Sequence, residues 1–239
     1  MPDSMPELLF QARLTSDPSG PLVTFYDDET GERAELSAKS LGNWVAKTHF
    51  LLLDELGTAP GDRAYLSLPV HWLAAPILLG CWFAGLEVVT DPAQASVAFC
   101  DLATVQSGAV AGVPDVFAVS LLSMARSAEP PEGSSDYAAA VRVQPDSWAA
   151  VRPQAAAQDP ALDGISRAQL ARQAAGTAAE LGLDSGGRLM WTEPEFGATA
   201  WVAALLAPLA VGGSVVLVRS ADRGKTAARA ASEQVTAIR

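Results

Sequence analysis

Cysteine and histidine are scarce in this sequence, which has two of each among 239 residues. Cys81 and Cys100 lie in apolar stretches without a Cys-x-x-Cys spacing, which disfavours a metal or redox site and predicts two buried thiols. His49 and His71 have no nucleophile or second ligand at a meaningful spacing, so structural or surface roles are expected for both. We therefore predict no metal site, no cofactor and no catalytic residue.

Basic residues are also in the minority, because 16 Lys and Arg stand against 27 Asp and Glu, for a formal net charge of −11. Nucleic acids and anionic membranes attract basic surfaces, so neither is an expected partner. The N-terminal sequence MPDSMPELLFQARLTS lacks a basic head followed by an apolar core. A secreted protein is therefore not expected, and we predict a cytoplasmic location.

Long uncharged runs are present but interrupted. Residues 198–218 carry no charge and are long enough to cross a bilayer. Pro208 and the Gly-Gly-Ser at 212–214 divide this run, which predicts a buried helix followed by a β-branched strand. Residues 72–86 have the same form, with a proline and a glycine inside, and predict a second buried helix.

Two segments of the sequence repeat one another at a constant offset. LGTAPGDRAYLSLPVHW, at 56–72, is followed 125 positions later by LGLDSGGRLMWTEPEFG, at 181–197. The matching pairs are Gly57 and Gly182, Gly61 and Gly186, Arg63 and Arg188, and Pro69 and Pro194. The flanks match as well, since AGLEVV corresponds to VGGSVV and LSAKSL corresponds to ISRAQL.

Each repeat has the pattern helix, turn, strand, helix, turn, strand. Apolar residues recur at every third or fourth position over 41–56, which predicts an amphipathic helix ending at Gly57. The second copy opens with Ser166 and Gln169 at capping-box spacing, and its helix should end at Gly182. Alternating helices and strands predict an α/β fold with largely parallel sheets flanked by helices.

The two repeats predict two related α/β lobes, in which the strands beginning at Ala64 and Leu189 occupy equivalent places. Residues 123–146 are rich in Pro, Gly, Ser and charge, and we interpret them as a long surface connection between the strand DVFAVSLL and a short strand at SWAAV. The division is drawn within this connection. It gives a first lobe at residues 1–135 and a second at 136–239.

The first repeat resembles the opening of the adenylate-forming superfamily, which includes acyl-CoA synthetases, nonribosomal adenylation domains and luciferases. The resemblance rests on the order helix, LG..PGDR, apolar strand, LP, buried helix and AG..VV. The second repeat resembles a later part of the same large domain, with GGRLMWTEPEFG, LLAPLAVGGSVVL and EQVT in order. The resemblance covers about residues 20–239. It implies that the repeats are the two related subdomains of the superfamily's N-terminal domain.

The resemblance also implies a phosphate loop of the form S-G-T-T-G-x-P-K-G, which wraps ATP phosphates in this superfamily. Glycines let backbone amides converge on the anion, while hydroxyls and a lysine add donors and charge. Region 152–165 stands at this place, with Pro160 as the shared proline and Asp159 adding a negative charge. The donors and glycines are replaced by Gln154, Ala155, Ala156, Ala157 and Gln158, and Ala161 stands at the lysine. The sequence therefore predicts a degenerate phosphate loop.

Two further departures from the superfamily pattern concern the acid and the downstream parts. The phrase P-x-F-H implies a histidine or aromatic residue near the activated carboxylate, whereas Gly197 follows Pro194-Glu195-Phe196 here. The chain also ends before the adenine- and ribose-binding segment, the metal-binding glutamate and the C-terminal domain with its catalytic lysine. We therefore expect a truncated homologue, similar to short bacterial members of unassigned function.

Two further segments are candidate ligand sites. Gly224-Lys225-Thr226 lies between a predicted strand and helix, as in a GxxxxGK[ST] loop, but Arg219 replaces the first glycine and favours an ordinary helix start. Trp191, Glu193 and Phe196 lie at the carboxyl end of a predicted parallel strand, where open α/β sheets bind ligands. They are the candidate residues of a retained acyl or aryl pocket, with core packing as the alternative for the two aromatic residues.

Three functions remain open at this point. We favour a pseudoenzyme that acts by binding a protein partner, by self-association or by regulation. The second is a protein that binds a small carboxylic acid, acyl or aryl, without ATP. The third is a split acyl-CoA synthetase-like ligase completed by another chain, which the degenerate loop disfavours because the phosphate site belongs to the half that is present.

Overall fold

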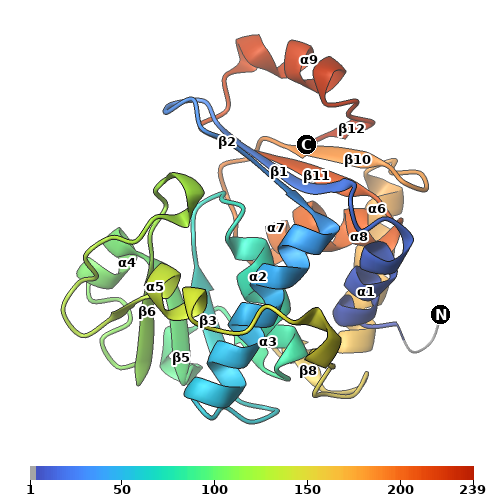
Figure 1. Ribbon diagram of the computed structural model, residues 1–239. Helices are drawn as coiled ribbons and strands as arrows, with labels where there is room; N and C mark the ends of the chain where they lie inside the picture. The colour runs from blue at the N-terminus through green and yellow to red at the C-terminus, as the bar shows by residue number, and fades with distance from the viewer. Residues whose placement is uncertain (1–3) are drawn as a thin grey trace. The chain divides into compact units, whose positions relative to one another are not determined.

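The computed structural model describes residues 4–239 and contains two β-sheets (Figure 1). By their internal contacts, the residues form two compact units, which we call the terminal unit and the central unit. The terminal unit combines the chain up to Leu41 with Pro69–Trp72 and Ala168–Arg239, and the central unit combines Gly42–Leu68 with Leu73–Arg167. Each unit thus takes segments that are far apart in the sequence.

The terminal unit holds a five-stranded sheet of order β12-β10-β11-β1-β2. Its elements are α1 (Pro6–Ser16), β1 (Pro21–Asp27), β2 (Arg33–Ser37), β10 (Arg188–Trp191), α7 (Ala198–Trp201), the π-helix η5 (Val202–Leu206), α8 (Ala207–Ala210), β11 (Ser214–Arg219), α9 (Arg223–Ser232) and β12 (Ala237–Ile238). Two helices, α2 (Ala38–Phe50) and α6 (Arg167–Glu180), carry the chain between the units.

The central unit holds a seven-stranded sheet of order β7-β6-β5-β3-β4-β8-β9. Its elements are the π-helix η1 (Leu51–Glu55), β3 (Arg63–Ser67), α3 (Ala74–Phe83), β4 (Glu87–Val89), η2 (Pro92–Gln94), β5 (Val97–Asp101), α4 (Leu102–Gln106), β6 (Asp115–Val119), η3 (Ser123–Ala125), β7 (Ser135–Asp136), α5 (Tyr137–Arg142), η4 (Trp148–Ala150), β8 (Pro160–Leu162) and β9 (Ile165–Ser166).

Most strand pairs in both sheets are parallel, and those of β1 with β2 and of β8 with β9 are antiparallel. Strands such as β11 and β10 consist of nearly continuous buried apolar residues, as expected for parallel strands covered on both faces. The predicted α/β class is confirmed.

The two compact units differ from the lobes drawn at residues 1–135 and 136–239. Residues 136–167 lie in the central unit, because β8 pairs with β4 through Leu162 and Val88. The chain up to Leu41 lies in the terminal unit, because β1 pairs with β11 along its length. Hydrogen bonding between distant strands therefore determines the composition of each unit.

The two sequence repeats have the same strand pairing in the structure. β3 pairs in parallel with β4, with Arg63 opposite Glu87, and β10 pairs in parallel with β11, with Arg188 opposite Ser214. The prediction that these strands occupy equivalent places is confirmed by this register. Each strand begins at its arginine, one residue earlier than expected.

The turns that precede these strands use the same backbone conformation. Gly61 and Gly186 have φ values of 95° and 75°, in the left-handed region that favours glycine. The amide of Gly61 donates to the carbonyl of Gly85 at 3.0 Å, and the amide of Gly186 donates to that of Val211 at 2.8 Å. These glycines recur in both repeats because each turn requires this conformation.

The equivalence extends to a third strand that the sequence did not reveal. β5 lies on the other side of β3, and β12 lies on the other side of β10. The carbonyl of Arg63 accepts from the amide of Ser96 at 2.9 Å, and that of Arg188 accepts from the amide of Thr236 at 2.8 Å. The short β12 has too few residues to match β5 by sequence.

Both uncharged runs form a helix, as predicted, and a strand follows each helix. α3 is buried over all ten residues, and β4 follows it. In the second run, η5 precedes Pro208, and the amide of Ala207 donates to Val202, five residues back, before the helix ends at Ala210. Within residues 4–239, no helix is both long enough and apolar enough to span a bilayer.

Two local predictions in the middle of the chain are wrong. SWAAV is not a strand but contains the 3-10 turn η4, in which the amide of Val151 donates to Trp148 at 3.0 Å. Residues 123–146 are not only a surface connection, because they include β7 and α5. Tyr137 at the start of α5 is fully buried, and its hydroxyl lies 2.8 Å from that of Thr48. Tertiary packing therefore orders a segment whose composition is typical of a loop.

Candidate functional site

The predicted degenerate phosphate loop, region 152–165, packs on the turn between α3 and β4 in the central unit. The amide of Gln154 donates to the carbonyl of Phe83 at 3.1 Å. Gly85 has a positive φ of 85°, and a Cβ placed on it would lie 3.2 Å from the Cβ of Gln154. At the start of the loop, the amide of Gln154 thus already has an acceptor, and Gln154 lies close to the backbone of Gly85.

Asp159 closes the loop on itself. Its carboxylate Oδ2 accepts from the amide of Ala156 at 2.8 Å, and its own amide donates to the carbonyl of Ala156 at 3.1 Å. The carboxylate of Asp159 therefore accepts from an amide that, in a phosphate-binding loop, would donate to the phosphate. The loop residues differ in exposure: Gln154, Ala156, Gln158 and Pro160 are exposed, Ala155 and Ala157 are half-buried, and Ala161 is buried.

The end of the loop is held by two large side chains that sequence reasoning missed. The guanidinium of Arg167, at 0% exposure, donates to the carbonyls of Pro160 at 2.5 Å, Trp82 at 3.1 Å and Leu86 at 3.2 Å. The indole of Trp82 donates to the carbonyl of Ala161 at 2.9 Å. These contacts make region 152–165 a structural segment of the central unit.

The three candidate pocket residues at the end of β10 do not share one environment. Trp191 and Phe196 are buried, at 6% and 7% exposure, whereas Glu193 is exposed. The indole Nε1 atoms of Trp191 and Trp201 are buried, and neither has a hydrogen-bond partner among residues 4–239. A pocket built from Trp191, Glu193 and Phe196 stays a prediction.

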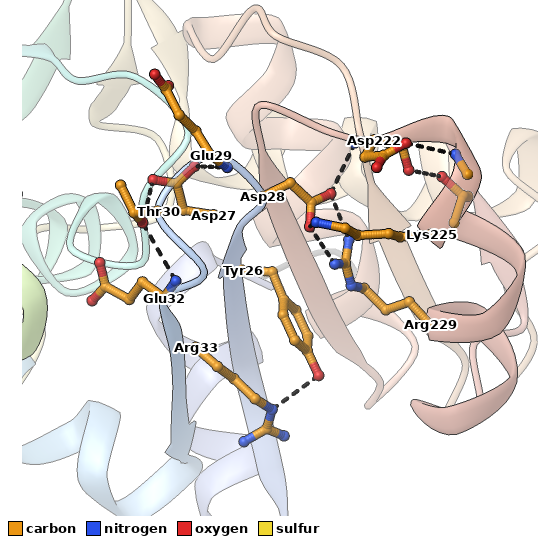
Figure 2. A network of polar contacts seen from close by, with 12 residues as sticks. Tyr26, Asp27, Asp28, Glu29, Thr30, Glu32, Arg33, Asp222, Lys225 and Arg229 are labelled. Atoms are coloured by element: carbon orange, nitrogen blue, oxygen red, sulfur yellow. Dashed lines mark hydrogen bonds and ion pairs between the residues drawn. The ribbon is translucent and has the colours of Figure 1, made fainter.

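Gly224-Lys225-Thr226 forms the first turn of α9 and carries no open phosphate site. The carboxylate of Asp222 caps this helix by accepting from the amide of Gly224 at 2.8 Å. Lys225 lies 3.4 Å from Asp28, and Figure 2 shows its side chain directed at that carboxylate. The ordinary helix start that the sequence favoured is the arrangement observed.

The same aspartate joins the β1–β2 turn to α9. Asp28 Oδ1 accepts from Arg229 at 2.5 Å, and Asp28 Oδ2 accepts from the amide of Asp222 at 2.8 Å (Figure 2). The hydrogen bond from Arg229 lowers the pKa of Asp28 to about 2. The Arg229 guanidinium also lies 4.3 Å from the ring centroid of Tyr26. This network joins the β1–β2 turn to α9 within the terminal unit.

The two histidines and the two cysteines are buried, as expected for structural roles. Burial lowers the pKa of His71 to about 3 and that of His49 to about 4. Burial also raises the pKa of Cys81 and of Cys100 to about 12, so both are thiols at neutral pH. Over residues 4–239, no cluster of three or more His, Cys, Asp or Glu is placed to hold a metal ion.

The depressed pKa of His71 predicts a dependence of stability on pH. The unfolded chain binds a proton at His71 below about pH 6.5, but the folded chain does so only near pH 3, so stability should fall as pH drops through this window. In His71→Gln, the slope of unfolding free energy against pH between 4 and 6 should decrease by about 1.4 kcal/mol per pH unit. Urea denaturation at several pH values measures this slope. An unchanged slope would show that the pKa of His71 is the same in the folded and the unfolded chain.

No protein-family model matches the chain. A curated protein of Mycobacterium tuberculosis (strain ATCC 25618 / H37Rv), described as a TIGR03089 family protein, is 40% identical over 245 residues, and the match covers 99% of this chain and 98% of the relative. This chain belongs to the TIGR03089 family. The near-complete coverage means that this TIGR03089 protein and its relative have almost the same length.

Solved structures show which fold this TIGR03089 protein shares. It is similar to a Brucella canis acyl-CoA synthetase, with a TM-score of 0.80 and 19% identity over 99% of this chain and 47% of that one. It is also similar to the anthranilate CoA ligase AuaEII, with a TM-score of 0.75 and 14% identity over 99% of this chain and 49% of the ligase. A fatty acyl-adenylate ligase from L. pneumophila matches with a TM-score of 0.70 and 13% identity, over 97% and 43% of the respective chains.

The chain therefore spans about half the length of the solved structures it matches. At identities this low, the structural similarity establishes the fold alone. This fold is the one that the resemblance implied. Whether the TIGR03089 protein is a truncated homologue in the evolutionary sense stays a prediction.

Proposed function

We propose that this TIGR03089 protein is a non-catalytic member of the adenylate-forming fold, which acts by binding and has lost the ability to hold ATP phosphates. The observation that carries the proposal is the closed loop at Asp159. Its carboxylate accepts from the amide of Ala156, in the region where the resemblance places phosphate-binding amides. A carboxylate at this place repels the anion that the loop would have to bind.

The rest of the loop supports the same conclusion. The amide of Gln154 is bonded to Phe83, and the carbonyls of Pro160 and Ala161 are bonded to Arg167 and Trp82. These contacts fix the segment against the central sheet with its backbone groups in use. The chain also brings a net charge of −11, so no general electrostatic attraction compensates for the missing lysine.

Binding of a small carboxylic acid is the second candidate, and one observation favours it. Trp191 and Trp201 each bury an indole N–H without an acceptor among residues 4–239. Buried donors are normally satisfied, so an acyl or aryl acid could supply the missing acceptor. A protein partner, self-association and a cytoplasmic location remain proposals that rest on sequence alone.

Calorimetric titration tests these two candidates separately. We expect no saturable heat with MgATP in the range of about 1 µM to 1 mM that is typical for enzyme substrates. Benzoate and octanoate serve as probes for an acid, and saturable binding that is weakened in Trp191→Phe would support the second candidate. This substitution removes the N–H and retains the aromatic ring. Saturable MgATP binding in that range would contradict the first candidate.

A further inference from the structure

A cavity of about 450 Å³ in the central unit has the size of a small-molecule site. It is lined by the amino end of β6, by the edge strand β7, by α5 and by the residues at the end of η1. Its apolar lining includes Leu56, Val116, Pro130 and Ala139. The lining residues that the structure describes include none from region 152–165, so this cavity is distinct from the loop that carries the proposed function.

The charged residues that line the cavity are all acidic. Glu55 and Asp115 are exposed and Asp136 is half-buried, and the described lining contains no Lys, Arg or His. None of these three carboxylates forms an ion pair in the part of the chain that the structure describes. Charges on the lining of so small a cavity act on a ligand with little screening, since the Debye length is about 8 Å at physiological ionic strength. The cavity is therefore suited to a cation.

The groups that donate to these carboxylates leave most of the negative charge in place. Asp136 accepts from a main-chain amide at the start of α5 at 3.0 Å, and Glu55 accepts from the side-chain amide of Gln144. Both donors are uncharged. One cation approaches from α2, because the ammonium of Lys47 donates to the main-chain carbonyl of Gln144 at 2.7 Å. A single positive charge offsets at most one of the three carboxylates.

The register of the two strands sets the spacing of Asp115 and Asp136. Phe117 lies opposite Ser135 in the parallel pair of β6 and β7, so Asp136 lies three residues further along the strands than Asp115. At about 3.3 Å per residue, this offset is about 10 Å. Positive charges that are separated along an elongated ligand match this spacing better than a compact cation does. Within residues 4–239, no group of three or more His, Cys, Asp or Glu is placed to hold a metal ion.

We propose that this cavity binds alkylammonium groups separated by an aliphatic spacer, as in a linear polyamine. The ammonium groups pair with the carboxylates of Asp115 and Asp136, and the methylene groups of the spacer are buried against the apolar lining. Lysine side chains of a partner protein carry the same chemistry. A second copy of this chain does not fit, since its net charge of −11 opposes association with an acidic surface.

Calorimetric titration with spermidine at low ionic strength tests this proposal. Octanediol is an uncharged match of similar length, and propanediamine carries two ammonium groups on a short spacer. We expect spermidine to bind saturably and octanediol not to bind. Propanediamine should bind at least about threefold more weakly than spermidine, because a short spacer reaches one carboxylate at a time and each exposed ion pair contributes modestly.

The peptide acetyl-Lys-Gly-Lys-amide distinguishes the two sources of the ammonium groups. Tighter binding of this peptide than of spermidine would assign the cavity to lysine side chains of a partner protein. Tighter binding of spermidine would assign it to a free polyamine.

A double variant of the cavity and a matched control locate the binding. Asp115→Asn with Asp136→Asn removes two charges at nearly constant shape, and Asn retains the N-cap of α5. This variant should raise the Kd for spermidine at least about fivefold. Glu180→Gln with Asp184→Asn removes the same charge from two exposed residues of the terminal unit and should bind spermidine as the wild type does.

Three results would overturn the proposal: no saturable binding of spermidine or of the peptide, equal binding of octanediol, or equal Kd values in the cavity variant and the control. If the cavity variant fails to fold, Asp115→Asn alone decides, since this side chain is exposed, and it should raise Kd about twofold. None of these results depends on whether the protein binds MgATP, so this proposal and the proposed function can fail separately.

Discussion

Replacing Arg167 with alanine is expected to lower the free energy of unfolding by about 3–5 kcal/mol. The guanidinium donates to three main-chain carbonyls, those of Trp82, Leu86 and Pro160, and the side chain is fully buried. Alanine would leave these acceptors unsatisfied and would open a cavity between α3 and the loop. Urea denaturation of the wild type and the variant gives the difference directly.

Arg152→Ala is the matched control for this measurement. Arg152 lies in the same loop and donates to the carbonyls of Ala149 and Val151, but it is exposed. Its removal should change stability by less than about 1 kcal/mol, since substitutions of exposed side chains usually have small effects. Equal losses in the two variants would show that Arg167 does not anchor region 152–165.

Local signals in the sequence predicted the repeated part of the fold. The left-handed glycines Gly61 and Gly186 were visible as a repeated spacing, because each turn needs its glycine whatever surrounds it. The burial of α3 and β11 was visible as continuous apolar composition. These features depend on the residues next to them in the chain, which is why a single sequence reveals them.

Features that depend on distant contacts were missed. The composition of the two units follows from the pairing of β1 with β11 and of β8 with β4, which no local pattern encodes. Tyr137 is buried by packing around Thr48 in a segment that looked like a loop. The structural role of Arg167 could not be read either, because its three acceptors lie in other segments.

The candidate site was predicted in part. The sequence located region 152–165 and the negative charge of Asp159, since these follow from residue identities. It did not predict that the carboxylate would bind the amide of Ala156, because that contact depends on the turn geometry.

The second large effect expected is the absence of adenylation. Activation of an acid needs donors aimed at the charge that develops on the transferring phosphate, and loss of one such donor commonly costs about a hundredfold or more in rate. Here the resemblance places alanines and glutamines at several donor positions together, and Asp159 already occupies the amide of Ala156. The combined loss should bring any rate below detection.

Carboxylate-dependent exchange of labelled pyrophosphate into ATP tests the central claim most directly, with an active acyl-CoA synthetase assayed alongside as the positive control. We predict that the purified TIGR03089 protein gives no exchange above the protein-free background with any acid tested. Exchange that rises with protein concentration, is abolished in Ala156→Pro and persists in Lys225→Ala would contradict the account and support a split ligase.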